Sequence, residues 1–284
     1  MKVLVCGATG KVGSAVIREL RQRGVEVRAL ARKAPPPGKL PEGVETAIGD
    51  LLDPPSLEAA LRGVDKMFLL NAVAADELTQ GLIGYGMARQ AGVKHITYLS
   101  VYKVDRFPDV PHFASKLAIE RALQAGDVEF TILRPGFFYQ NEVGMRPVME
   151  SAGIYPMPIG TAGIAAVDIR DIAAAAAITL TSAGHAGKTY NPVGPGQLTG
   201  PRSAELWSAA LGRKVVYPDE NWEATEAQMR QFMPSWMAHD LRVMLEGYHE
   251  RGFRAEDPDR EAFASLLGQA PRSHATMVQE WTGR

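Results

Sequence analysis

Short apolar runs recur along the first half of the chain, and amphipathic stretches separate most of them. Each run has the length of a strand that is buried on both faces, as strands are in a parallel sheet. Strands that alternate with helices at this spacing predict right-handed crossovers and a doubly wound α/β sheet of the Rossmann type. The predicted strands are residues 3–6, 25–31, 44–48, 66–71, 95–100 and 129–133.

Helical periodicity fills most of the intervals between these strands. Ser56 is the predicted N-cap of a small helix that ends before Gly63. The interval 31–43 is too rich in proline for a crossover helix, so we expect a loop there. The other predicted helices of this half are 11–23, 76–91 and 113–124.

Beyond Arg134 the alternation is lost, and residues 137–163 show no clear period. We therefore expect a larger domain and a smaller, mostly helical C-terminal lobe. Ligands of a parallel sheet bind beyond the carboxyl ends of its strands, so the lobe is expected to close a substrate pocket there. Further strands are predicted at 164–168 and 188–193, and helices at 169–181, 201–211 and 235–248. The larger domain comprises 1–136 and 164–193, and the lobe comprises 137–163 and 194–284.

Three glycines follow the first strand in MKVLVCGATGKVGS. Gly7 permits a tight turn, Gly10 lets the backbone approach a pyrophosphate, and Gly13 lets the next helix pack closely. The N-terminus of that helix then faces the phosphates with free N–H groups and the positive end of its dipole. A glycine triplet alone is a weak signal, but its place between a strand and a helix predicts a dinucleotide site. The alternative is an ordinary strand, turn and helix rich in glycine.

Composition excludes several other classes of protein. The 284 residues are 46% hydrophobic and 22% charged with a net charge of −1, and no basic block carries interleaved aromatic residues, which argues against a nucleic-acid partner. The single Cys6 excludes an internal disulfide, and the six histidines lack paired-ligand spacing, so no metal site is expected. The apolar stretch 172–180 is too short to span a bilayer, and we expect a cytoplasmic protein.

Two basic residues, Arg32 and Lys33, follow the second strand where an acidic residue would bind a ribose diol. A guanidinium can hold a 2′-phosphate through two hydrogen bonds, and a neighbouring lysine adds a positive charge. The pair therefore predicts NADP(H) rather than NAD(H). Asp50, after the third strand, is placed either to meet the adenine amino group or to cap the approach to the next helix.

Four motifs taken together resemble the NmrA-like branch of the atypical short-chain dehydrogenase/reductases. They are GATGKVG at 7–13, GD at 49–50, HFASK at 112–116 and LRPGFFYQN at 133–141. The resemblance is good to about residue 200 and weaker beyond it. It implies NADP(H) bound through a set of residues that we take as the expected cofactor contacts. They are Gly7, Thr9, Gly10, Lys11, Val12, Arg32, Lys33, Asp50, Asn71, Ala72, Lys116, Pro135 and Phe138.

One position departs from the pattern of the wider family. Standard members carry Tyr-x-x-x-Lys, whose tyrosine donates a proton, but here His112 stands four residues before Lys116. An imidazole can act as acid or base near neutral pH. His112 and Lys116, with Ser100 in the place of the family's serine, are therefore the candidate catalytic residues. Each has a structural alternative. His112 could simply begin a helix, Lys116 could be a solvated helix lysine, and Ser100 could simply end a strand.

Family reductases with an altered tyrosine position act on quinones or triarylmethane dyes, which fits this departure because such acceptors delocalise the incoming charge. We therefore expect an NADPH-dependent oxidoreductase that transfers hydride to a quinone or related polycyclic aromatic, in a tailoring step of aromatic polyketide (antibiotic) biosynthesis. Methionine and aromatic residues suit a flat apolar substrate, with ordinary packing as the alternative. The candidate substrate residues are Tyr102, Phe137, Tyr139, Met233, Trp236 and Met237.

The same branch contains regulatory proteins that bind the dinucleotide without turning it over. An NADP(H)-sensing regulator with a protein partner is therefore the alternative function. A third possible function is that of an epimerase or dehydratase. The absence of the Tyr-x-x-x-Lys tyrosine argues against this function too. The sequence reveals no protein partner, such as an oxygenase or a regulator, and leaves monomer and homodimer open.

Overall fold

The computed structural model describes residues 1–218 and 221–283, and the chain forms two compact units. We describe each unit by itself. The first unit consists of Met1–Asp105, His112–Arg134 and Ile169–Tyr190, and the second of Arg106–Pro111, Pro135–Asp168 and Asn191–Arg284.

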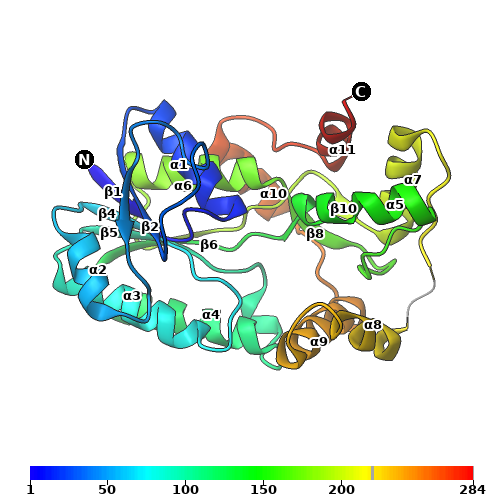
Figure 1. Cartoon of the computed structure of the whole chain (residues 1–284), viewed down its shortest axis with the longest axis horizontal. Helices are drawn as coiled ribbons and strands as arrows, with labels where there is room; N and C mark the ends of the chain where they lie inside the picture. Colours follow the sequence, from blue (N-terminus) through cyan, green and yellow to red (C-terminus); the bar gives the residue numbers. More distant parts are fainter. Residues whose placement is uncertain (219–220, 284) are drawn as a thin grey trace. The chain divides into compact units, whose positions relative to one another are not determined.

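A seven-stranded sheet forms the centre of the first unit (Figure 1). Its order is β3-β2-β1-β4-β5-β6-β9, and each neighbouring pair of strands is parallel. The chain moves outward from β1 to β3 and then returns to build the other half from β4, which confirms the doubly wound fold. The strands are β1 (Lys2–Val5), β2 (Glu26–Ala31), β3 (Glu45–Ile48), β4 (Lys66–Leu69), β5 (His95–Leu99), β6 (Glu129–Leu133) and β9 (Lys188–Tyr190).

Helices cover both faces of this sheet, as Figure 1 shows, with α1 and α6 on one face and α2, α3 and α4 on the other. The proline-rich residues 32–44 form a loop without a helix, as predicted. The helices are α1 (Lys11–Gln22), α2 (Pro54–Leu61), α3 (Glu77–Gln90), α4 (Pro111–Ala125) and α6 (Ile169–Thr181).

The predicted start of α2 at Ser56 is wrong, because the helix begins two residues earlier at Pro54. Proline lacks an N–H group and has a fixed φ, so it suits the first turn of a helix. The Ser56 hydroxyl instead accepts a hydrogen bond from the Asp50 backbone N–H at 3.0 Å and donates one to the Asp53 carbonyl at 2.8 Å. Ser56 therefore ties the start of α2 to the loop that follows β3.

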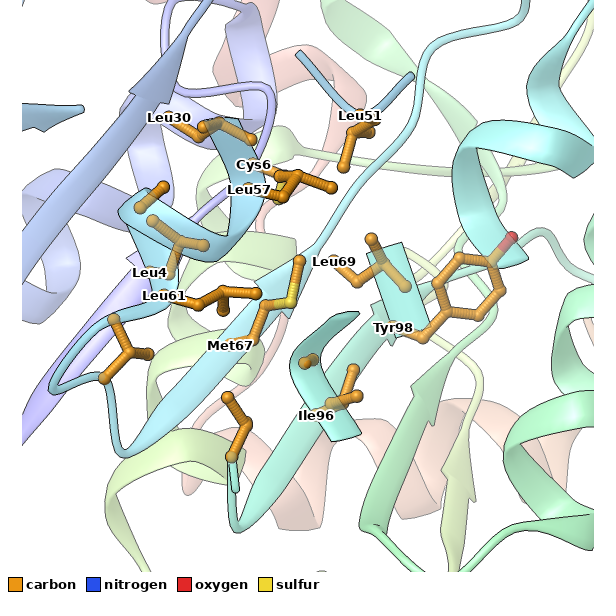
Figure 2. Packing of buried hydrophobic residues seen from close by; sticks show 14 of the residues in the cluster. Leu4, Cys6, Leu30, Leu51, Leu57, Leu61, Met67, Leu69, Ile96 and Tyr98 are labelled. Carbon is orange, nitrogen blue, oxygen red and sulfur yellow. The ribbon is translucent and has the colours of Figure 1, made fainter. Parts of the chain in front are cut away.

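An apolar core fills the space between the sheet and α2, α3 and α4. Figure 2 shows Leu4, Met67 and Ile96, from the neighbouring strands β1, β4 and β5, in one cluster with Leu57 and Leu61 of α2. These side chains are wholly buried. Burial of each large side chain contributes about 1.5–3 kcal/mol, so this layer holds the strand ends in fixed positions.

The second unit contains a small sheet of order β10-β8-β7 and most of the remaining helices. The strand predicted at 164–168 belongs here and not to the larger domain, because Ile164–Val167 pairs with β7 and β10. No helix in the described residues combines the length and apolar character that a membrane crossing requires. The elements are β7 (Phe137–Phe138), β8 (Ile164–Val167), β10 (Gln197–Leu198), α5 (Arg146–Ala152), α7 (Gly200–Leu211), α8 (Trp222–Met229), α9 (Ser235–Arg251), α10 (Asp257–Leu267) and α11 (His274–Thr282), with short 3₁₀ turns at Tyr139–Asn141 and Val143–Met145. A further 3₁₀ turn, Val104–Arg106, lies where the chain passes from the first unit to the second.

Candidate functional site

A cavity of about 570 Å³ lies within the first unit at the carboxyl ends of β1, β2, β3 and β4. The strand order reverses between β1 and β4, and ligands of doubly wound sheets bind at this switch point. The residues that line the cavity come from the loops that follow these strands and from the start of α3. They are Gly7, Ala8, Thr9, Gly10, Leu30, Ala31, Arg32, Gly49, Asp50, Leu51, Leu52, Leu70, Asn71, Ala72, Val73, Ala74, Asp76 and Gln80.

Gly7 and Gly10 line one wall of the cavity, and Gly13 lets α1 pack against the same turn. Gly7 has φ +63°, a left-handed conformation that side chains disfavour. A Cβ on Gly13 would lie 2.2 Å from the Gly7 carbonyl oxygen, so only glycine lets α1 pack this closely on the turn. Gly10 is the N-cap of α1, and the first turn carries neither an acidic residue nor a side-chain cap. The N-terminus of α1 is thus suited to bind an anion.

The loops after β2 and β3 bring charged groups to the same cavity. Arg32 is exposed and lines the cavity where β2 ends, whereas the exposed Lys33 is not among the lining residues. Asp50 also lines the cavity, and its Oδ1 accepts a hydrogen bond from the Leu52 backbone N–H at 2.9 Å. Both roles considered for Asp50 are thus compatible with its place, since it caps a turn and borders the cavity.

Asn71, directly after β4, is the most informative residue of the cavity wall. Its side chain is buried, and its Nδ2 donates a hydrogen bond to the Glu77 carbonyl at 3.0 Å. Its Oδ1 is buried and has no hydrogen-bond partner among the described residues. A buried unsatisfied acceptor costs about 1–3 kcal/mol, and a ligand that carries an N–H or O–H donor would remove this cost. The helix terminus, the Arg32 cation and this acceptor together fit a phosphorylated dinucleotide.

Lys116 lies on α4 and is buried. Its ammonium is 2.7 Å from Glu77 Oε1 and 6.0 Å from the centroid of the Tyr98 ring, and Lys116 is not among the residues that line the cavity. Burial, with a smaller contribution from the Glu77 carboxylate, raises the pKa of Tyr98 well above its usual value. The predicted contact between Lys116 and the cofactor therefore competes with an ion pair that the sequence does not suggest.

The two other candidate catalytic residues are also buried. His112 lies one helical turn before Lys116 on α4, and its ring meets Phe113 edge to face at 4.8 Å. Ser100 directly follows β5, and its Oγ has no hydrogen-bond partner in the described part of the chain. The Ser100 hydroxyl is thus able to bind a ligand, and the catalytic roles of both residues remain predictions.

The remaining expected contacts are spread over both units. Thr9 and Ala72 line the cavity, and Lys11 and Val12 form the first turn of α1. Pro135 and Phe138 belong to the second unit, as do all the candidate substrate residues except Tyr102, which is buried in the first unit. The candidates of the second unit are Phe137, Tyr139, Met233, Trp236 and Met237.

Within the second unit these substrate candidates differ in exposure. Tyr139 is buried, and its ring stacks on His274 with the centroids 5.1 Å apart, so it packs the interior of this unit. Trp236 is 38% exposed on α9, and Met233 and Met237 beside it are half-buried. Trp236 and the two methionines therefore keep apolar surface that a substrate could cover.

A buried carboxylate in the second unit was not anticipated from the sequence. Glu142 accepts hydrogen bonds from the Tyr155 hydroxyl and the Trp207 indole N–H, each at 2.6 Å, and His274 Nε2 lies 2.8 Å from it. Burial, with the Glu142 charge, raises the pKa of Tyr155 well above its usual value. These residues are far apart along the chain, so no local motif indicates the cluster. No group of three or more His, Cys, Asp or Glu side chains in the described residues is arranged to hold a metal ion.

Comparison with known proteins gives a consistent set of similarities. A model of the NmrA-like family matches residues 1–269. The NAD(P)H azoreductase of Xenophilus azovorans is 35% identical over 246 residues, which is 85% of each chain. The NADPH-dependent quinone oxidoreductase of Escherichia coli, complexed with NADPH, has a TM-score of 0.85 at 27% identity over 99% of both chains. The triphenylmethane reductase of Citrobacter sp., complexed with NADP(H), has a TM-score of 0.86 at 27% identity over 98% of this chain and 99% of that chain.

Proposed function

Because this chain belongs to the NmrA-like family, we propose that it is an NADP(H)-dependent oxidoreductase that reduces a quinone or a related polycyclic aromatic acceptor. The three relatives described above are named as reductases or oxidoreductases of azo, quinone and triphenylmethane compounds, and two of their structures contain NADPH or NADP(H). The observation that carries the proposal is the cavity at the switch point of the sheet, which combines the N-terminus of α1, the Arg32 cation and the buried Asn71 acceptor.

In this proposal the loops of the first unit bind the dinucleotide. The N-terminus of α1, which begins after Gly10, holds the pyrophosphate, because the first turn of a helix offers N–H groups and a positive dipole end. Arg32 binds the 2′-phosphate, and Asn71 Oδ1 accepts a hydrogen bond from the cofactor. When bound, NADPH supplies the hydride that reduces the acceptor.

The acceptor class follows from the residue that replaces the usual tyrosine. A quinone delocalises the charge that it gains, so positioning of the reactants does more of the work than a strong proton donor. His112 and Ser100 are the groups of this chain that we assign to proton donation and substrate binding. Met233, Trp236 and Met237 are assigned to the acceptor, since thioethers and rings suit a flat apolar molecule.

Stopped-flow loss of NADPH absorbance with a series of naphthoquinones and anthraquinones tests this proposal. We expect multiple turnovers with at least one quinone and none with a simple aliphatic ketone. If NADPH binds but no acceptor oxidises it, the protein is a dinucleotide-sensing regulator and the proposal is wrong.

The narrower prediction, a tailoring step in aromatic polyketide biosynthesis, concerns the identity of the quinone. Hydroxylated polycyclic quinones of polyketide type would then give a higher kcat/KM than unsubstituted naphthoquinone. Equal values for the two groups would remove the biosynthetic prediction and leave the reductase proposal intact.

A further inference from the structure

Two polar residues at the start of α3, Asp76 and Gln80, line the dinucleotide cavity and are hydrogen-bonded to each other. Both are half-buried, and Gln80 Nε2 donates to Asp76 Oδ1 at 2.7 Å. Asp76 is the N-cap residue of α3, where a carboxylate usually accepts a hydrogen bond from a backbone N–H of the first turn. Among the described residues the Asp76 side chain makes no such cap bond. The Asp76 carboxylate is therefore used to orient Gln80 and not to cap the helix.

This contact decides which end of the Gln80 amide is left for a ligand. A carboxylate oxygen only accepts hydrogen bonds, so the amide nitrogen must face Asp76. The amide oxygen lies on the other branch of the same planar group, where a donor of a bound molecule can reach it. Gln80 thus offers the occupant of the cavity an acceptor whose direction is fixed by Asp76.

Gln80 lies next to the loop that follows β3. Gly84 is one helical turn after Gln80 on the same face of α3, and a Cβ there would lie 3.3 Å from Leu51 Cδ2. Leu51 and Leu52 both line the cavity, and Leu52 is 42% exposed. The Gln80 acceptor and an exposed apolar side chain therefore belong to the same part of the cavity.

Apolar walls with acceptors beside them fit an adenine ring. The flat faces of an aromatic base need apolar contacts, and adenine carries at its edge an amino group with two N–H donors. Hypoxanthine has a carbonyl in place of this amino group, so an acceptor of the protein would face another acceptor. The apolar residues that line this part of the cavity are Leu51, Leu52, Val73 and Ala74.

We propose that Gln80, oriented by Asp76, accepts a hydrogen bond from the adenine amino group and makes the site selective for adenine dinucleotides. This inference rests on the proposed NADP(H) site. Because the amino group has two N–H donors, the Gln80 bond adds to the contact considered for Asp50 and does not replace it. Asp76 is a positioning residue, since it acts on the cofactor through Gln80.

The test compares the dissociation constants of NADPH and of deamino-NADPH, in which hypoxanthine replaces adenine. Fluorescence titration gives both constants, and the thermal midpoint is recorded for each variant. The wild-type protein should bind NADPH about tenfold more tightly, because deamino-NADPH leaves the acceptors without a donor. Gln80→Ala should weaken NADPH binding about fivefold and leave deamino-NADPH binding unchanged, so that the preference falls to about twofold.

Asp76→Ala separates the positioning role from a general effect on α3. Without the carboxylate the Gln80 amide can turn its Nε2 toward the hypoxanthine carbonyl, so the preference for NADPH should fall to about threefold or less. Gln90→Ala is the matched control, because Gln90 is an exposed glutamine at the end of the same helix and outside the cavity. This control should leave both dissociation constants unchanged.

Equal affinities of the wild-type protein for the two dinucleotides would overturn the inference and leave the proposed function intact. A preference that survives unchanged in Gln80→Ala would overturn it as well, since another group would then recognise the adenine. Equal weakening of both dinucleotides in Gln80→Ala would show that Gln80 only stabilises α3, which also contradicts the inference. If the wild-type protein binds neither dinucleotide, the proposed function fails and this inference fails with it.

Discussion

Arg32 and Asn71 mark the two kinds of recognition that the cavity offers. Arg32 is an exposed cation at the end of β2, suited to a phosphate that stays partly hydrated. Asn71 is a buried amide at the end of β4 whose oxygen has no hydrogen-bond partner in the described residues. The Arg32 charge at the end of β2 favours a phosphorylated ligand, and the Asn71 acceptor at the end of β4 favours a ligand with hydroxyl or amide donors. A dinucleotide has both kinds of group.

Replacement of Asn71 by alanine should weaken NADPH binding. The variant loses the acceptor that the cofactor would satisfy, and a hydrogen bond of this kind is worth about a factor of ten in affinity. Asn191→Ala is the control, because the Asn191 amide oxygen is likewise buried without a described partner but does not line the cavity. Isothermal titration with NADPH checks both variants, and an equal effect of the two would contradict the role of Asn71.

At the scale of elements, the close approach of α1 to the turn after β1 determines the shape of the anion site. A Cβ at position 13 would lie 2.2 Å from a backbone oxygen, and backbone cannot move aside as a side-chain tip can. The N-terminus of α1 can lie this close to the turn only because residue 13 is glycine and has no side chain.

Gly13→Ala should lower the free energy of unfolding by about 1–3 kcal/mol and weaken NADPH binding as α1 is pushed away from the turn. Gly86→Ala is the matched control, since Gly86 lies in α3 and a Cβ there meets no heavy atom within 4 Å. This control should be neutral or stabilising by up to about 1 kcal/mol, because alanine favours helices over glycine. Urea unfolding of both variants measures the difference, and equal stabilities would contradict the packing argument.

Much of the first unit was predictable because local patterns determine it. Apolar runs indicate the ends of the strands to within three residues, and the glycine spacing indicates the turn before α1. The pairing of β8 was not predictable, since periodicity identifies a strand but not its neighbours. The turns and short helix between 139 and 152 are likewise too short to show a period.

The candidate site was predictable only where a motif is contiguous. The sequence indicates Gly7, Gly10, Arg32 and Asp50, all of which line the cavity. It does not indicate the partnership of Glu77 with Lys116, because the two residues are brought together by the packing of α3 against α4. Tertiary contacts of this kind leave no trace in the spacing of residues.

At the scale of the whole molecule, histidines with lowered pKa values make the free energy of unfolding depend on pH. His95 is buried at the start of β5, where its Nε2 lies 3.1 Å from Thr131 Oγ1. Burial, with the positive charge of Lys66, lowers the pKa of His95 below its usual value of 6.5. Burial and the Lys188 charge likewise lower the pKa of His185. As the pH falls, these two histidines therefore take up protons at a higher pH in the unfolded chain than in the folded chain.

The sign of the effect follows from this difference in proton binding. Protons favour the unfolded state, so the contribution of His95 is complete above pH 6.5 and is lost as the pH falls below that value. The free energy of unfolding should fall between about pH 7 and pH 5, by at most about 1.4 kcal/mol per pH unit for each histidine. His95→Gln should flatten this dependence, and urea unfolding over the same range measures it. An unchanged slope in the variant would show that His95 is not responsible.

The most direct test of the account is to measure the dissociation constants of NADPH and NADH for the wild-type protein and for Arg32→Asp. Arg62→Asp, at a side chain that is 75% exposed and outside the dinucleotide cavity, controls for the change in net charge. We predict that the wild-type protein binds NADPH more tightly than NADH, and that Arg32→Asp loses NADPH affinity by about tenfold to a hundredfold while NADH binding is kept. Equal affinities for the two dinucleotides, unaffected by Arg32→Asp, would contradict the account.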